Sequence, residues 1–485
     1  MTAVNLDLTG FTAALCYDCT CVPRKNELGF VDMKDYLLPI RTGQKMNTRQ
    51  EAALILRLSL PAILAQISSI IMQYIDASMV GHLGANASAS IGLVSSTTWL
   101  VGGIITAASM GFSVCVAHRI GAQDEKGARV IVKWGLVCNL VFSLFIMAIC
   151  VMVSPHLPEW MGGDIAIRKD SSAYFLVYAL SIPVRELLLS SQGMIQSSGN
   201  IRVPSILNVI MCALDVVFNA LLIPRFGVMG AALGTAFSFV VVAAVMLYIL
   251  LVKTPALCLV GRSEKDNVTF TQFLSRELPV ALKIAIPVAI DNIIMGFAYV
   301  AFTRIVSPFG TVSVAANSFS ITAESLCYMP GFGIGVAATT VVGQCIGAQR
   351  KDLARRLGWM SVILGMMIMG LSGVLMWVFA PWMIGILSPD EEIRRLGTQV
   401  LRIEAFAEPL YGASIVAAGV FRGAGETLLS SVLNLLSVWA VRIPLANFLG
   451  SMYGLKGAWI AMATELCVRG TLFLIRLALW NRRKA

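Results

Sequence analysis

Twelve apolar stretches, each about as long as a membrane span, constrain this chain more than any other feature. A helix needs about 20 predominantly apolar residues to cross the hydrocarbon core of a bilayer. Each stretch therefore predicts a membrane helix, although the fourth and the tenth also contain charges and a proline. The stretches lie at roughly 59–80, 95–117, 132–153, 171–190, 203–223, 228–252, 283–303, 319–343, 358–380, 397–418, 428–449 and 455–478.

The composition excludes a conventional soluble enzyme and a disordered chain. Of the 485 residues, 57% are hydrophobic and 13% are charged, and the mean hydropathy is +0.79. An average soluble domain carries about 25% charged residues. A soluble chain of this composition would expose apolar surface to water. Membrane β-barrels show short alternating segments instead, so we expect an all-α integral membrane protein with twelve transmembrane helices.

The positive charges predict the orientation of these helices. The net charge is +10, but Lys and Arg lie in short runs between apolar stretches, so we expect no nucleic-acid partner. With the N-terminus in the cytoplasm, 26 of the 37 basic residues fall in segments on the inside and seven on the outside. This distribution satisfies the positive-inside rule. An even number of spans also places both termini on one side, so we expect both in the cytoplasm.

An internal repeat divides the chain into two halves. The stretch HRIGAQDEKGAR (118–129) recurs as QCIGAQRKDLAR (344–355), at an offset of 226 residues. The same offset relates Pro61 to Pro287, Gly84 to Gly310, Pro155 to Pro381, Pro183 to Pro409, Gly193 to Gly419, Gly199 to Gly425 and Asn208 to Asn434. Because six helices separate the copies, the two six-helix halves have the same orientation and a pseudo-twofold axis along the membrane normal. Transporters with such parallel repeats bind the substrate between the halves. One half rocks against the other, which opens the site to each side of the membrane in turn.

The repeat predicts four segments along the chain. These are a polar N-terminal tail (1–50), an N-terminal six-helix half (51–252), a cytoplasmic linker (253–282) and a C-terminal six-helix half (283–485). The tail contains Cys16, Cys19 and Cys21, two short spacings that are typical of a metal ligand set. No fourth Cys or His lies nearby, so we expect a polar tail without a metal. Met46 opens a second plausible start of translation.

The sequence lacks the motifs of covalent or metal-dependent catalysis and of nucleotide binding. It contains no HExxH pair, no P-loop and no GxGxxG after a strand. We therefore expect no enzyme activity, no cofactor and no ATP use. Acids within the apolar stretches are the main chemical signal, because an ionised Asp at mid-bilayer costs roughly 2.5–3.5 kcal/mol on insertion scales and needs a partner or a function.

The repeat and its matched residues resemble the multidrug and toxic compound extrusion (MATE) family. The resemblance spans about 50–480 and is carried by Pro61 with Asp76, the two Ile-Gly-Ala-Gln loops, GVFRGAGET (419–427) and LDVVFNALLIP (214–224). It implies an exporter of organic, often cationic, compounds that is driven by inward flow of sodium ions or protons.

Asp76 lies in the first apolar stretch, fifteen residues after Pro61. The resemblance implies an aspartate at this spacing from a kinking proline, acting as a carboxylate that takes up a proton or sodium. Pro61 removes one backbone hydrogen bond, so the helix can bend there. The alternative is an interfacial acid near the outer end of the helix.

The fifth stretch presents Asn208, Cys212, Asp215 and Asn219 at spacings of four, three and four. These spacings place the four residues on one helical face, which in lipid should point into the bundle. One interpretation is a cation site with Asp76, in which sodium would bind carboxylate and amide oxygens. The other is hydrogen bonding between helices. The family pattern is Asn followed by Asp four residues later, whereas here Asp215 precedes Asn219.

The repeat offers an internal control for these acids. Asp76 corresponds to Phe302, Asp215 to Val441 and Asn219 to Leu445, so the second half lacks them. Asn208 corresponds to Asn434. We therefore expect ion coupling in the N-terminal half only.

The second half contains acids of its own. Asp291 lies near the inner end of the seventh helix, where it is either a gating residue or an acid at the membrane interface. Glu324 and Glu408 are our candidates for attracting a cationic substrate. Glu465 and Arg469 lie four residues apart, which favours an ion pair within one helix. Some MATE members carry a glutamate deeper in the seventh helix, where this chain has Met295.

Together these features predict a cation-coupled (H⁺ or Na⁺) antiporter that exports organic, cationic drugs or toxic compounds by alternating access. The alternative is a lipid-linked oligosaccharide flippase of a related superfamily, which usually has a cationic central cavity. A receptor or scaffold without transport fits poorly with buried acids that differ between the two halves. We expect a monomer in the plasma (bacterial inner) membrane, with the lipid bilayer and organic cations or drugs as its partners.

Overall fold

The computed structural model describes residues 36–259, 270–388 and 390–480, so the cysteines of the N-terminal tail lie outside the described residues. The described residues are almost entirely helical and contain no strand. This confirms the prediction of an all-α membrane protein. Eleven helices are long and apolar enough to cross a membrane.

The N-terminal half contains six long helices. They are α3 (Thr48–Gly81), α4 (Ala85–Gly121), α5 (Glu125–Val153), α7 (Ile165–Ser197), α8 (Arg202–Phe226) and α9 (Val228–Tyr248). Shorter elements are α2 (Leu38–Arg41), α6 (Leu157–Trp160) and the π-helix η1 (Ile249–Lys253). Several helices are longer than the apolar stretches that predicted them, because the helical backbone continues through polar residues at the membrane surface.

The C-terminal half repeats this order. Its helices are α11 (Leu278–Val306), α12 (Thr311–Gly347), α13 (Lys351–Leu387), α14 (Glu391–Glu404), α15 (Glu408–Gly423), α16 (Thr427–Ser437), α17 (Ile443–Tyr453) and α18 (Leu455–Leu479). The π-helix η3 (Val438–Arg442) joins α16 to α17, and η2 (Ser307–Phe309) follows α11. The predicted linker at 253–282 contains α10 (Phe270–Arg276) and the first turn of α11.

The tenth predicted span is divided into two helices. We expected one stretch over 397–418, but α14 ends at Glu404 and α15 begins at Glu408. Pro409 explains the break, because it has no backbone N–H to continue the preceding helix and is well tolerated in the first turn of a new one. Counted together, α14 and α15 complete the twelve-helix arrangement.

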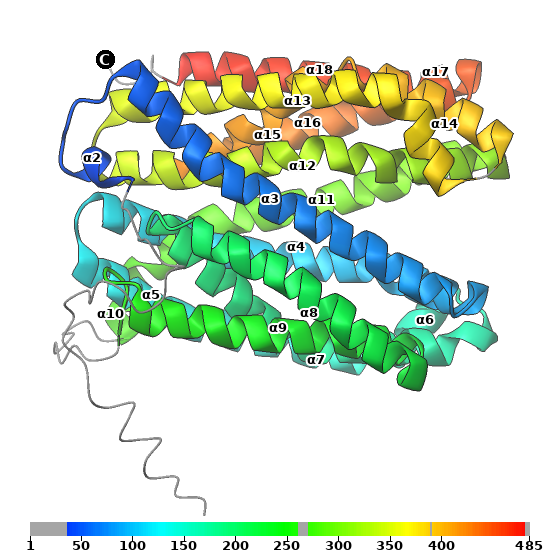
Figure 1. Cartoon of the computed structure of the whole chain (residues 1–485), viewed down its shortest axis with the longest axis horizontal. Helices are drawn as coiled ribbons and strands as arrows, with labels where there is room; N and C mark the ends of the chain where they lie inside the picture. Colours follow the sequence, from blue (N-terminus) through cyan, green and yellow to red (C-terminus); the bar gives the residue numbers. More distant parts are fainter. Residues whose placement is uncertain (1–35, 260–269, 389, 481–485) are drawn as a thin grey trace, which may run out of the picture.

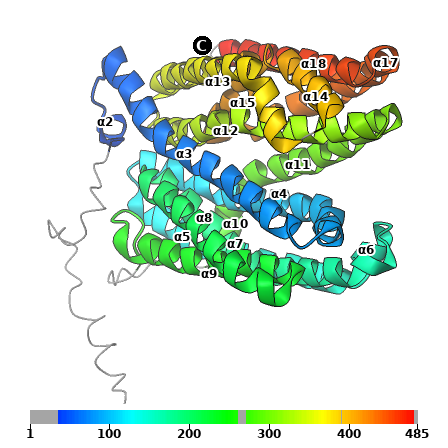
Figure 2. The same ribbon diagram turned by 45° about the vertical axis from the view of Figure 1, so that its right-hand side comes forward.

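The two halves form two bundles that lie side by side (Figures 1 and 2). The first helix of each half crosses to the other: α3 packs on α12 as well as on α8, and α11 packs on α4 as well as on α16. The spans of α4 and α12 are the two most buried, at 67% each, which places them at the interface between the halves. Across this interface, Tyr74 Oη donates to the Thr322 carbonyl at 2.6 Å.

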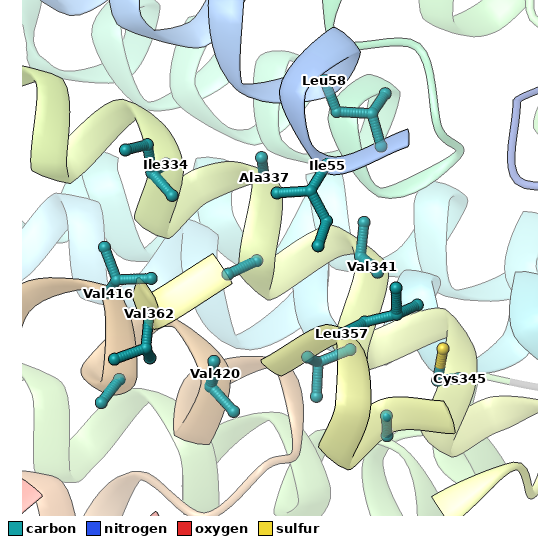
Figure 3. Close-up of a cluster of buried hydrophobic side chains, with 14 of the residues drawn as sticks. Ile55, Leu58, Ile334, Ala337, Val341, Cys345, Leu357, Val362, Val416 and Val420 are labelled. Carbon is teal, nitrogen blue, oxygen red and sulfur yellow. The ribbon is translucent and has the colours of Figure 1, made fainter. Parts of the chain in front are cut away.

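A core of the C-terminal half extends across the interface to α3. Figure 3 shows part of this core, with Ile55 and Leu58 of α3 against side chains of α12, α13 and α15. Glycines allow the helices to approach closely: a Cβ on Gly419 would lie 2.4 Å from the Gly335 carbonyl oxygen, and one on Gly333 would lie 2.6 Å from the Ile63 Cα. Small residues commonly allow close helix packing in lipid, because the hydrophobic effect contributes little to helix association there.

We call the end of the bundle at which α3 begins the basic end. Here the two Ile-Gly-Ala-Gln loops lie between α4 and α5 and between α12 and α13. Both loops place their glutamine in the left-handed region, with φ of 58° at Gln123 and 57° at Gln349. The repeat therefore preserves a local backbone conformation as well as a sequence.

Candidate functional site

The structure brings together two acids and an amide from α3 and α8. Asn219 Nδ2 donates to Asp76 Oδ1 at 2.8 Å and to Asp215 Oδ2 at 3.0 Å. The amide of Asn219 thus connects a carboxylate of the first helix with one of the fifth. Asp215 and Asn219 are both fully buried. Buried carboxylates of this kind must be paired, protonated or bound to a cation.

The helical period of α8 explains this arrangement. Asn208, Asp215 and Asn219 all belong to the buried face of α8, whereas Val209, Val217 and Leu221 are exposed on the other side. Residues four apart lie on the same face of a helix, so Asp215 and Asn219 point in the same direction. Asn208 lies on this face about three turns before Asn219.

Helix α9 gives the site its back wall, which the sequence analysis missed. A Cβ on Gly234 would lie 2.0 Å from Asn219 Oδ1, and one on Gly230 would lie 2.4 Å from the Leu222 carbonyl oxygen. Only glycine at these two positions lets α9 pack this closely against α8. The spacing of Gly230 and Gly234 is the GxxxG signal for close helix packing in membranes, so the sequence did contain a pointer to this contact.

Two oxygens of the site remain available as acceptors. Asp215 Oδ1 and Asn219 Oδ1 are buried, and neither has a hydrogen-bond partner among the described residues. Carboxylate and amide oxygens are hard ligands suited to an alkali cation, and a carboxylate can also hold a proton. The donor set therefore fits either sodium or a proton.

Pro61 lies away from this cluster, in the first half of α3. The helix continues through it without interruption, from Thr48 to Gly81. Gly333 of α12 contacts the backbone at Ala62 and Ile63, directly after the proline. The helix that carries Asp76 is therefore packed against the opposite half at the point where a bend is expected.

The predicted site residues of the second half lie in different surroundings. Asp291 of α11 accepts a hydrogen bond from Asn434 Nδ2 of α16 at 2.9 Å. Glu324 of α12 lines a small cavity with Tyr299, Tyr328, Tyr411, Arg442 and Met295. Glu408 is fully buried, and neither of its carboxylate oxygens has a partner among the described residues. No hydrogen bond or ion pair described in the structure joins these acids to Asp76 or Asp215.

A charge network in the same half was predicted in part. Arg469 Nε lies 3.1 Å from Glu465 Oε1, which confirms the ion pair within α18. Arg442 of η3 also binds this carboxylate, with Nε and Nη2 at 2.9 and 2.5 Å from Oε2, and Ser437 Oγ donates to Oε1 at 2.6 Å. Glu465 is fully buried. One carboxylate thus partners two guanidinium groups, one of them on another helix.

The repeated motif forms a twofold contact between the halves at the basic end. His118 Nε2 lies 2.8 Å from the Gly423 carbonyl oxygen, and Gln344 Nε2 donates to the Ser197 carbonyl oxygen at 2.8 Å. Each residue of the first pair differs by 226 from its equivalent in the second, so one interaction is repeated across the pseudo-twofold axis.

The glycines of the motif complete this contact. A Cβ on Gly121 would lie 2.2 Å from the Gln344 carbonyl oxygen, and one on Gly347 would lie 2.0 Å from the His118 carbonyl oxygen. The ends of α4 and α12 therefore touch backbone to backbone. We call the four residues His118, Gly121, Gln344 and Gly347 the gate contact, which joins the two halves at the basic end.

Two six-helix repeats with buried acids in the membrane define a membrane transporter of the parallel-repeat class. A model of the MatE family matches residues 61–221 and 287–448, once in each half and with starts 226 residues apart. The chain therefore belongs to the MatE family of multidrug and toxic compound extrusion transporters.

Curated relatives and solved structures agree with this assignment. The chain is 27% identical over 436 residues to the probable multidrug resistance protein NorM of Thermotoga maritima, covering 87% of this chain and 91% of that protein. It is 22% identical over 450 residues to the protein of the same name from Oceanobacillus iheyensis, covering 90% and 98%.

Among solved structures, a variant of the Vibrio cholerae MATE transporter VcmN superposes with a TM-score of 0.84 at 17% identity, covering 90% of this chain and 98% of that one. A MOP superfamily transporter from Pyrococcus furiosus superposes with a TM-score of 0.83 at 21% identity, covering 92% and 98%. These likenesses confirm the fold.

Proposed function

We propose that this protein is a cation-coupled antiporter, driven by H⁺ or Na⁺, that exports organic cations by alternating access. The observation that carries the proposal is the Asn219 amide, which connects the carboxylates of Asp76 and Asp215 within the membrane. Curated relatives named as probable multidrug resistance proteins support drugs as the substrate class.

The coupling step follows from the charge of the site. A cation or a proton entering between Asp76 and Asp215 neutralises buried negative charge, which lowers the cost of keeping α3 and α8 packed together. Because α3 also packs on α12, a shift of α3 changes the contact between the two halves. One charge moving down 100 mV supplies roughly 2.3 kcal/mol, which corresponds to about a fortyfold concentration ratio.

We assign substrate attraction and gating to the acids of the second half. Glu324 lies beside three tyrosines in a small cavity, and Glu408 lies at the break before Pro409. Aromatic faces and carboxylates are the groups that recognise organic cations. Asp291, bound to Asn434, is assigned to the gate between α11 and α16.

The basic end faces the cytoplasm in this proposal, with both termini there, and the protein functions as a monomer in a bacterial inner membrane. Its loops carry most of the Lys and Arg residues, as the positive-inside rule requires. Transport then needs neither ATP nor nucleic acid as a partner.

A flippase for lipid-linked oligosaccharides would need cationic groups free to bind phosphate. Two buried arginines of the second half, Arg442 and Arg469, do not offer them, because Glu465 binds both. Helices α3 and α8 contribute acids to the interior. The electrostatics therefore favour a cationic substrate.

Proteoliposomes loaded with ethidium, a fluorescent cation, test the proposal under an imposed sodium gradient or an imposed pH gradient. We expect one gradient to drive dye movement, and Asp76→Asn and Asp215→Asn to abolish it while the protein still folds. Asp170→Asn, the same change at an exposed acid of α7, is the matched control and should transport normally.

The outcomes separate the parts of the proposal. Dye movement under only one gradient identifies the coupling ion. Movement that persists in Asp76→Asn and Asp215→Asn contradicts the coupling site but keeps the transporter. Absence of movement under either gradient, with dye bound, contradicts cation-coupled export and favours the flippase.

A further inference from the structure

The segment that precedes α3 folds back across the gate contact. Residues 36–46, which include α2, lie at the basic end of the bundle beside α12 (Figure 1). We call these residues the N-terminal segment. The repeat does not account for them, and the transport site does not use them.

The C-terminal half holds the backbone of this segment. Arg350, which follows the second Ile-Gly-Ala-Gln loop, donates to the carbonyl oxygens of Pro39 and Ile40 at 3.0 and 3.3 Å and to that of Gln44 at 3.1 Å. Arg41 Nε donates to Gln344 Oε1 at 3.0 Å. The Gln344 side chain thus takes part in both structures. Its nitrogen donates a hydrogen bond in the gate contact, and its oxygen accepts one from the N-terminal segment.

The N-terminal half holds the same segment from the other side. Arg41 Nη2 donates to the Ser198 carbonyl oxygen at 2.8 Å, and Gln123 Nε2 donates to the Arg41 carbonyl oxygen at 3.0 Å. Arg202 Nη2 donates to Tyr36 Oη at 2.9 Å, and its guanidinium lies 5.1 Å from the centre of the Tyr36 ring. The side chain of Arg41 therefore joins α12 of one half to the loop after α7 of the other.

Apolar contacts seat the segment between these polar ones. Leu37 and Ile40 are both fully buried and belong to the core cluster that includes Cys345 of α12 and Ile201 of the N-terminal half. Two buried aliphatic side chains contribute far more than the exposed contacts of an ordinary surface loop. The segment is therefore docked across the boundary between the halves.

The pseudo-twofold axis does not repeat the Arg350 contacts in the first half. The position equivalent to Arg350 in the first half is Asp124, which caps α5 by accepting from the Gly127 N–H. A carboxylate cannot donate hydrogen bonds to carbonyl oxygens, so Asp124 cannot hold a backbone as Arg350 does.

We propose that the N-terminal segment is a latch that stabilises the state in which the basic end is closed. Opening this end separates Gln344 from Ser197 and His118 from Gly423, so it also separates the two groups that Arg41 connects. The latch must then release from one half. The inference rests on the proposed alternating access.

Spin labels report this opening directly. Cysteines at Lys126 of α5 and Lys351 of α13, in a background without the native cysteines, place one label on each half at the basic end. Pulsed dipolar spectroscopy in liposomes, with and without ethidium, then gives the fraction of molecules at the longer distance.

Two variants remove the latch contacts, and one controls for charge. Arg41→Ala breaks the link between the halves, and Arg350→Ala frees the segment backbone. We expect each to raise the long-distance fraction about tenfold, the scale of one lost hydrogen bond to a charged group. Lys45→Ala removes the same charge from an exposed position of the same segment and should change nothing.

The result that would overturn the latch is specific. A wild-type protein that populates both distances, with an unchanged fraction in Arg41→Ala and Arg350→Ala, excludes a latch and leaves alternating access intact. If the wild type and both variants show only the short distance, alternating access fails as well. Arg41 and Arg350 both lie outside the membrane-spanning helices, so we expect both variants to fold.

Discussion

Asn219 stands where the related family pattern has an aspartate, and Asp215 stands where it has the asparagine. The structure explains why this reversal is compatible with a cation site. The two side chains lie on one face of α8, and the amide of Asn219 reaches both Asp215 and Asp76. We therefore expect the proposed site to need carboxylates and an amide within one turn, whatever their order along the helix.

The double variant Asp215→Asn/Asn219→Asp tests this at the residue scale. It restores the family order and keeps two carboxylates and one amide in the site, so we expect ethidium efflux within about threefold of wild type. Asp215→Asn alone removes one carboxylate and should abolish efflux, because the coupling charge is lost. A double variant as inactive as the single one would show that the order is essential.

The sequence predicted which polar residues meet, but not how they are held. Asp76 and Asp215 were predicted as site residues because acids are costly in lipid, and the helical period placed Asn219 beside Asp215. The closeness of α9 at Gly234 depends on the angle between two helices, which hydropathy does not encode. In the same way, the Arg350 contacts of the N-terminal segment join residues 311 apart in sequence.

At the scale of elements, hydropathy located all the spans but missed local departures from a straight helix. Helices α14 and α15 share one predicted span, and the π-helix η3 interrupts the eleventh. Each extra residue in a π-helix shifts the face that follows, and functional or charged residues often lie there. Here η3 places Arg442 against Glu465 of α18. This contact joins two helices, so the sequence pattern alone did not predict it.

Glu465→Gln tests whether this network holds η3 in place. The change leaves Arg442 and Arg469 without the carboxylate that pairs with both, so we expect a loss of about 3–5 kcal/mol in stability. Glu426→Gln, at a half-exposed acid that binds Arg476, is the matched control and should cost less than about 1 kcal/mol. Thermal unfolding of both variants in detergent measures the difference, and equal melting temperatures would contradict the structural role.

The whole molecule is organised by one repeated contact. The Ile-Gly-Ala-Gln motif was recognisable in the sequence as a repeat. Its structural role, a contact between the two copies, is visible only in the fold. Gly121 faces the Gln344 backbone, and Gly347 faces the His118 backbone, so each copy supplies the glycine that the other copy needs. The motif is therefore a self-complementary surface between halves, and its small residues set how closely α4 and α12 approach.

Gly121→Ala and Gly347→Ala insert a methyl group at 2.2 and 2.0 Å from a backbone carbonyl oxygen of the opposite half. Because backbone at a helix end cannot move aside without separating the halves, we expect each variant to disfavour the closed state by about 1–3 kcal/mol, the usual cost of overpacking. The spin-label pair at Lys126 and Lys351 should then show a larger long-distance fraction.

Gly92→Ala is the control for this prediction, because it lies in the same helix as Gly121 and a Cβ there meets nothing within 4 Å. The pseudo-twofold axis makes a second demand: Gly121→Ala and Gly347→Ala should open the basic end to a similar extent, since each blocks one of two equivalent contacts. A strong effect from only one of them would mean that the halves separate asymmetrically. The gate contact would then not act as a twofold unit.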